Sequence, residues 1–237
     1  MSDALQDTLY ELLHSGSTSN PALTRLLDDY STYHVVLVVV GGFFVIVLSV
    51  LTAFFWRKFR RSTSASERRW SFERTTYFCL GLLSGAVSLL LTLIVGANLG
   101  NARNPREGFI GVVDALGRAQ PGTRTHELHQ SFTTWLQSET ASMPTLIDRR
   151  IDERLAWQQP KAIIACALLA VFAVLGVRLW RTMIGKSRVR ASSWTMNDRV
   201  LLLAGVGTVV SCLLLMLMVI GNTQASIAPI VMTLQFG

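Results

Sequence analysis

The residues in this chain best suited to bind a metal are two histidines, His126 and His129. They lie three positions apart in a segment with helical periodicity, so both imidazoles would share one face of a helix. The pair lacks the four-residue spacing of His-Glu-x-x-His zinc hydrolases, and no cysteine or third histidine is near. A metal site would have to borrow Glu139, Asp152 or ligands from a partner. We therefore predict no metal, and an exported metalloenzyme stays an alternative hypothesis that metal analysis would test.

Nucleophilic catalysis needs a nucleophile beside a base, and the sequence offers no such pair. The serines fall mostly in loops or among small residues of apolar segments that contain no Asp or Glu. No Gly-rich phosphate loop follows a strand pattern, and no histidine sits centrally in an apolar segment to hold a haem. We predict that the protein is not an enzyme and has no cofactor. The three cysteines, Cys79, Cys166 and Cys212, also lie in apolar segments, so no disulfide is expected elsewhere.

Four long apolar segments dominate the chain, and the remaining residues lie before, between or after them. Each is about as long as the roughly 17–25 apolar residues that a helix needs to cross a bilayer. Their only full charge is Arg178, near a helix end, so they offer no obvious site for moving ions or protons. We predict an all-α membrane protein: a four-transmembrane-helix bundle with a small extracytoplasmic helical cap. The four segments are 33–56, 77–99, 162–180 and 200–221.

The net charge of +7 is concentrated in two short connectors. Connector 57–76 holds seven basic and two acidic residues, and connector 181–199 holds five basic and one acidic. Short basic loops stay on the cytoplasmic side, which predicts that both termini and residues 100–160 lie outside. The charge therefore indicates topology and contact with membrane lipids, and we predict no nucleic-acid partner.

Five parts follow from this topology. An extracytoplasmic N-terminal arm precedes a first transmembrane hairpin, a helical insert outside the membrane separates it from a second hairpin, and an apolar tail ends the chain. Their boundaries are 1–32, 33–99, 100–160, 161–221 and 222–237.

Apolar stripes at helical spacing predict the elements of the cap. The arm should contain two short helices, the second starting at Asn20-Pro21, where a capping side chain precedes a helix-starting proline. The insert carries three stripes, and the tail is unusually apolar for an exported segment, so it either folds back onto the bundle or inserts into a neighbouring subunit. The stripes are Leu5, Leu9, Leu12 and Leu13; Leu23, Leu26 and Leu27; Phe109, Val112, Val113 and Leu116; Leu128, Phe132, Trp135 and Leu136; and Ile147, Ile151 and Leu155.

Small residues give the second and fourth segments faces on which helices can approach closely, the usual basis of helix association in lipid. These faces either pack within the bundle or dock onto another subunit. Their members are Gly81, Ser84, Gly85, Ser88, Gly205, Gly207 and Ser211.

Interface residues end the first and third segments in a similar way. Both segments close on Trp-Arg, and a second tryptophan, Trp70 or Trp194, follows fourteen residues later. This similarity indicates either a duplicated hairpin or the ordinary preference of membrane interfaces for aromatic and basic residues. We predict that lipid headgroups and the membrane interface are contacted by Trp56, Arg57, Arg60, Arg61, Trp180 and Arg181.

The absence of catalytic groups favours a non-catalytic accessory subunit that scaffolds or docks partners in a larger membrane protein complex. The partners would be other integral membrane subunits or further copies of this chain. The alternative is a self-associating channel or transporter whose pore is lined by small polar faces of the second and fourth segments. The lack of disulfides and of Asn-x-Ser/Thr glycosylation sites favours a bacterial cell membrane.

Overall fold

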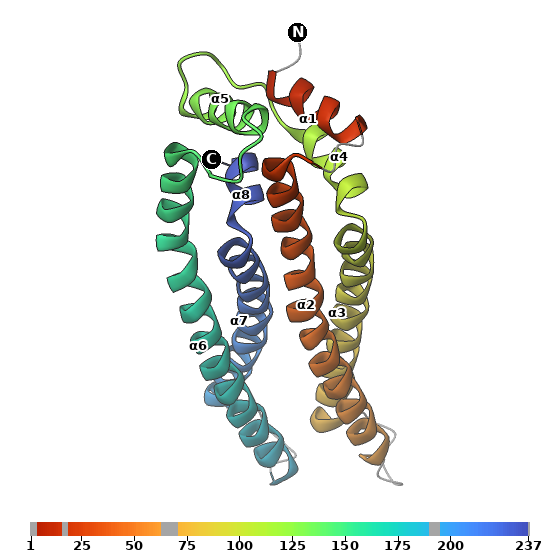
Figure 1. Ribbon diagram of the computed structural model, residues 1–237. Coiled ribbons are helices and arrows are strands. Elements are labelled where there is room, and N and C mark those ends of the chain that lie inside the picture. The colour runs from red at the N-terminus through yellow and green to blue at the C-terminus, as the bar shows by residue number, and fades with distance from the viewer. Residues whose placement is uncertain (1–3, 16–18, 63–70, 190–194, 237) are drawn as a thin grey trace. The chain divides into compact units, whose positions relative to one another are not determined.

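The computed structural model describes residues 4–15, 19–62, 71–189 and 195–236, and these residues form helices without any strand. Trp70, Trp194 and parts of both basic connectors lie outside the described residues. The helices (Figure 1) are α1 (Ala4–His14), α2 (Pro21–Arg61), α3 (Phe72–Arg103), α4 (Pro105–Ala115), α5 (Arg124–Gln137), α6 (Thr145–Val189), α7 (Met196–Ile227) and α8 (Pro229–Phe236).

Four of these helices, α2, α3, α6 and α7, are long and apolar enough to cross a membrane. They contain the four segments predicted from the sequence. The all-helical class and the four candidate spans are therefore confirmed, as expected for a multi-pass membrane protein. Their assembly into one bundle remains a prediction.

Two amphipathic segments that were predicted as short cap helices are instead the first turns of long helices. Helix α2 starts at Pro21, where the Oδ1 atom of Asn20 accepts a hydrogen bond from Leu23 N at 3.0 Å. No proline or glycine then interrupts the chain before the apolar segment, so the helix continues. Helix α6 likewise runs from Thr145 through Pro160. The boundaries at residues 32 and 160 thus mark a change in polarity along continuous helices.

The chain divides into two compact units, and each long helix contributes to both. The first unit comprises Met1–Val39, Val95–Ala162 and Ile220–Gly237, and the second comprises Val40–Ile94 and Ile163–Val219. The first unit thus combines α1, α4, α5 and α8 with one end of each long helix, while the second contains most of the apolar segments.

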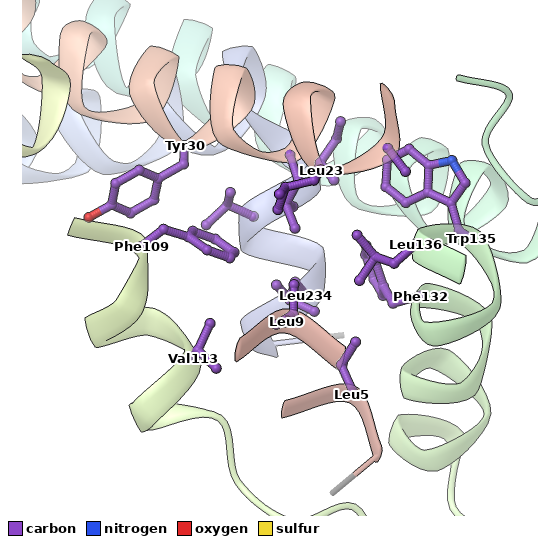
Figure 2. Close-up of a cluster of buried hydrophobic side chains, with 14 of the residues drawn as sticks. Leu5, Leu9, Leu23, Tyr30, Phe109, Val113, Phe132, Trp135, Leu136 and Leu234 are labelled. Carbon is purple, nitrogen blue, oxygen red and sulfur yellow. The ribbon is translucent and has the colours of Figure 1, made fainter. Parts of the chain in front are cut away.

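The first unit has a hydrophobic core, which we call the cap core (Figure 2). All five predicted stripes contribute to it, because each places apolar side chains on one side of its helix. Phe132 and Trp135 of α5 and Phe109 of α4 are its largest fully buried side chains, each at most 1% exposed. Its buried members are Leu5, Leu9, Leu13, Ala22, Leu23, Leu26, Tyr30, Phe109, Val113, Leu116, Leu128, Phe132, Trp135, Leu136, Ile147, Ile151, Ile230, Val231 and Leu234.

The apolar tail folds back into this core as α8. Ile230, Val231 and Leu234 are all buried there. The carboxylate of Asp29 in α2 accepts a hydrogen bond from Val231 N at 2.8 Å, in the first turn of α8. Of the two fates considered for the tail, the structure shows packing onto the same chain.

Four pairs of helix boundaries in the two halves of the chain are 124 residues apart. Helices α2 and α6 start at Pro21 and Thr145, and α4 and α8 start at Pro105 and Pro229; both pairs are 124 residues apart. The same separation relates both ends of α3 (Phe72–Arg103) to both ends of α7 (Met196–Ile227). The two tryptophan-arginine pairs also follow this register. A preference of membrane interfaces for Trp-Arg does not set helix lengths, so the constant separation supports duplication.

Packing of the small helices follows the same relation. Helix α1 contacts α4 and α5, while α5, its counterpart, contacts α8 and α1. We refer below to α1–α4 and α5–α8 as the first and second repeats.

Candidate functional site

The predicted small-residue face of α3 packs against α2 through a line of hydroxyl groups, which we call the first seam. Ser49 Oγ and Ser88 Oγ lie 2.9 Å apart, and Thr52 Oγ1 donates to Ser84 Oγ at 3.0 Å. Ser88 Oγ also lies within 3.3 Å of the carbonyl oxygen of Val45. In an apolar environment such hydroxyls need partners, and here each has a partner on the facing helix.

Two glycines make this close approach possible. A Cβ atom on Gly85 would lie 3.3 Å from Thr52 Cγ2, and one on Gly81 would lie 3.4 Å from Phe55 Cβ. The added Cβ would be tight at Gly85 and at about van der Waals contact at Gly81, so neither position leaves room for a bulky side chain without a shift of its neighbours. Gly81, Ser84, Gly85 and Ser88 thus all contact α2, the neighbouring helix of the same hairpin.

Helix α7 packs against α6 at positions that match the first seam. A Cβ atom on Gly205 would lie 3.3 Å from the ring of Trp180, and one on Gly176 would lie 3.2 Å from Thr208 Oγ1. Gly205 and Thr208 are the counterparts of Gly81 and Ser84 in the 124-residue register. Thr208 donates its hydroxyl hydrogen bond to Gly205 O within its own helix. This contact between α6 and α7, the second seam, is therefore made by close packing of side chains against glycines.

Gly207, another predicted member of the α7 face, lies apart from this contact, because a Cβ atom on it would meet no other atom within 4 Å. Ser211 is half-buried. Of the two glycines predicted on this face, Gly205 is therefore the one placed against a neighbouring helix.

The outer side of the first seam is a shallow groove of about 450 Å³ on the hairpin surface. Thr92 is exposed there and donates to Ser88 O at 2.7 Å, and no ionisable side chain lines the groove. The groove can therefore receive another helix or form hydrogen bonds, but its lining contains no acid, base or cationic group. It is lined by Ser49, Thr52, Ala53, Trp56, Gly85, Ser88, Leu89 and Thr92.

The predicted interface anchors are divided between exposed and packed positions. Arg57, Arg60 and Arg61 are exposed in the last turns of α2, and Trp56 is 43% exposed. Arg181 is exposed as well, but Trp180 packs on Gly205 and its indole N–H is buried without a hydrogen-bond partner. Trp180 thus contributes to helix packing.

Neither histidine of the His126/His129 pair belongs to a cluster of metal ligands. His129 is 4% exposed, and His126 Nε2 lies 3.0 Å from Gln130 Nε2. Among the described residues no three His, Cys, Asp or Glu side chains come together in a way that could hold a metal ion.

Sequence reasoning missed several residues that join the helices. Ser49 and Thr52 complete the first seam, and His34 Nδ1 lies 2.6 Å from Asn98 Oδ1 between α2 and α3. Ser49 and Thr52 are three positions apart on one helix face, as Ser84 and Ser88 are four apart. That spacing in two consecutive apolar segments was the available signal.

Comparison with known proteins adds no functional information. The chain matches no protein-family model, no curated protein and no solved structure. The case for a function therefore rests on the residues described above.

Proposed function

We propose that this protein is a non-catalytic integral membrane subunit that scaffolds or docks partners in a larger membrane protein complex. One observation carries the proposal. Only 11–22% of the residues in the most apolar stretch of each candidate span are buried, while the small helices outside these stretches enclose a core of their own. Most of the span surface is thus open to lipid or to the helices of other subunits.

The polar groups of the first seam support scaffolding over transport. Their hydroxyls are satisfied within the hairpin, and the apolar segments carry no full charge apart from Arg178. A helix pair closed in this way stabilises its own geometry.

A scaffold could dock its partners through its exported helices and apolar tail, but the cap core buries the apolar faces of both. We therefore move the proposed docking surface to the groove beside the first seam. Small residues there would let a partner helix approach closely.

We further propose an N-out, C-out arrangement in a bacterial cell membrane. The exposed arginines at the end of α2 support it, since basic residues are retained on the cytoplasmic side.

Native mass measurement after gentle extraction tests the docking proposal. We expect the chain to be recovered with a partner or as an oligomer, and Thr92→Trp in the groove should reduce that association. Leu93→Trp is the matched control, because Leu93 is 64% exposed and does not line the groove. An isolated monomer in mild detergent, or equal loss with both variants, would contradict the proposal.

The alternative is a self-associating channel in which small polar faces line a pore between protomers. The groove favours this function too, because Ser49, Thr52, Ser88 and Thr92 all line it. Thr208 contributes less, since it packs on Gly176. Flux through liposomes that contain the purified protein, abolished by Ser88→Leu, would favour the channel; liposomes without flux would favour the scaffold.

A further inference from the structure

The first unit contains a second hollow, of about 580 Å³, between the first part of α6 and the end of α8. It differs from the groove in chemistry, because it is lined by charged side chains. Its lining includes Arg150, Glu153, Arg154, Trp157, Thr233 and Phe236.

Two guanidinium groups give the hollow its charge. Arg154 Nη2 donates to Phe236 O at 2.9 Å, and Arg150 Nη1 donates to Glu153 Oε2 at 3.1 Å. A guanidinium has five N–H donors, so most of the donor capacity of each arginine is left for a ligand. Residues 149–161 carry four basic and two acidic side chains, which leaves the region positive.

Thr233 adds a polar group that the protein does not satisfy. It is 1% exposed, and its Oγ1 is buried without a hydrogen-bond partner. A buried hydroxyl in that state is destabilising, because it loses water and gains nothing in return. Thr233 also lines the hollow, so a ligand oxygen there would become its acceptor if the buried side chain turned toward it.

In the first repeat the corresponding positions belong to the cap core. The counterparts of Arg150, Arg154 and Thr233 in the 124-residue register are Leu26, Tyr30 and Phe109. All three are buried in the cap core, and the rings of Tyr30 and Phe109 pack edge to face with centroids 5.4 Å apart. The second repeat therefore has two cations and a hydroxyl in place of a leucine and two aromatic rings.

The hollow lies close to the start of the apolar segment of α6. Trp157 precedes residue 162 by five positions, about 7.5 Å along a helix, which is the depth of the headgroup layer of a bilayer. Trp157 and Phe236 are 70% and 68% exposed, and Lys161 Nζ lies 5.3 Å from the ring centre of Trp157. Exposed aromatic residues beside basic ones are typical of a membrane interface.

We propose that this hollow binds an anionic phospholipid. Arg150 and Arg154 donate to the phosphate, Thr233 donates to one of its oxygens, and Trp157 and Phe236 lie along the start of the acyl chains. Guanidinium groups suit phosphate because their paired donors match its oxygens. The inference rests on the candidate spans crossing a membrane and does not depend on the scaffold function.

Lipid titration of the delipidated full chain in detergent, followed by native mass spectrometry, tests the site. The wild-type protein should retain phosphatidylglycerol at least about tenfold more tightly than phosphatidylcholine. The double variant Arg150→Gln/Arg154→Gln should lose at least about tenfold in phosphatidylglycerol affinity. Arg149→Gln, which removes the same charge beside Glu153 but outside the hollow, should change affinity by less than about twofold.

Thr233→Val separates binding from folding. It should weaken phosphatidylglycerol binding a few fold, because the lipid loses one donor. It should leave the lipid-free protein at least as stable, because a methyl group of nearly the same volume replaces an unpaired buried hydroxyl. This variant decides the question if the double variant does not fold.

Two results would overturn the proposal. One is equal phosphatidylglycerol retention by the wild type, by Thr233→Val and, where it folds, by the double variant. The other is displacement of the lipid by an equal concentration of inorganic phosphate, which would identify a site for the free anion.

Discussion

Replacing Asn20 should destabilise the cap by removing two hydrogen bonds at once. Its side chain is 2% exposed; Oδ1 accepts from Leu23 N at 3.0 Å, and Nδ2 donates to Leu136 O at 2.8 Å. One amide thus satisfies an N–H in the first turn of α2 and a carbonyl in the last turn of α5, groups that helix ends leave unpaired.

The two bonds can be separated by substitution. Asn20→Ser keeps a capping oxygen but leaves Leu136 O buried without its donor, a loss of about 1–3 kcal/mol. Asn20→Ala also removes the cap, worth about 1 kcal/mol more. We therefore expect a total loss of about 2–4 kcal/mol for alanine, with serine between alanine and wild type.

Denaturant unfolding of the purified full chain would measure these free energies, and hydrogen exchange in α5 would localise the effect. Gln130→Ala on the exposed side of α5 is the control and should stay within about 0.5 kcal/mol of wild type. An Asn20→Ala variant that also stays within that range would show that neither hydrogen bond stabilises the cap. Equal destabilisation by serine and alanine would show that the capping bond contributes nothing.

Three further predictions concern other parts of the molecule. Burial raises the pKa of Asp29, which lies before the apolar segment of α2, from 3.8 to about 6, so the folded state binds this proton more tightly than the unfolded state. Stability should therefore fall as pH rises from about 4 to about 6, by at most about 3 kcal/mol; Asp29→Asn should remove this slope, and an unchanged slope would contradict the assignment. Gly85→Leu should cost about 1–3 kcal/mol in unfolding free energy because it overpacks the first seam, whereas Gly207→Leu, which faces open space, should cost little, and equal effects would count against the seam. Leu234→Ala should lower the unfolding free energy by about 2–5 kcal/mol, because Leu234 is buried in the cap core, and exposed Gln235→Ala should lower it by less than about 0.5 kcal/mol. A melting experiment in which Gln235→Ala is the more destabilising variant would contradict the packing of the tail on the core.

The spans and the cap stripes could be predicted from the sequence because both depend on local periodicity. Leu128, Phe132, Trp135 and Leu136 recur at helical spacing, and all four are buried in the cap core. Asn20 before proline likewise marked a helix start that the structure confirms.

The partners of the small-residue faces could not be predicted, because such a face indicates close approach and does not identify the other helix. Ser84 and Ser88 were recognised on α3, but their hydroxyl partners lie on α2. The separate arm helix was wrong for a related reason, since a change from polar to apolar sequence does not require a helix to end.

The hollow in the first unit could not be predicted from the sequence, for a different reason. Arg154 and Thr233 are 79 positions apart, and they meet only because α8 folds back onto the first part of α6. Neither residue has an unusual neighbourhood in the sequence. Their contrast with Tyr30 and Phe109 becomes visible only once the helix boundaries give the 124-residue register.

The packing of α1 on α5 has a consequence for how such a chain could have arisen. If the chain arose by duplication, each of these helices covers its own counterpart, so a half-length ancestor with the same fold would have buried that face by pairing with a second copy of itself. Such an ancestor would have been an obligate dimer whose folding depended on its concentration in the membrane. Fusion of two copies would have made the pairing intramolecular. It would also have allowed one copy to keep the core residues Tyr30 and Phe109 while the other acquired Arg154 and Thr233, a division that identical subunits cannot make.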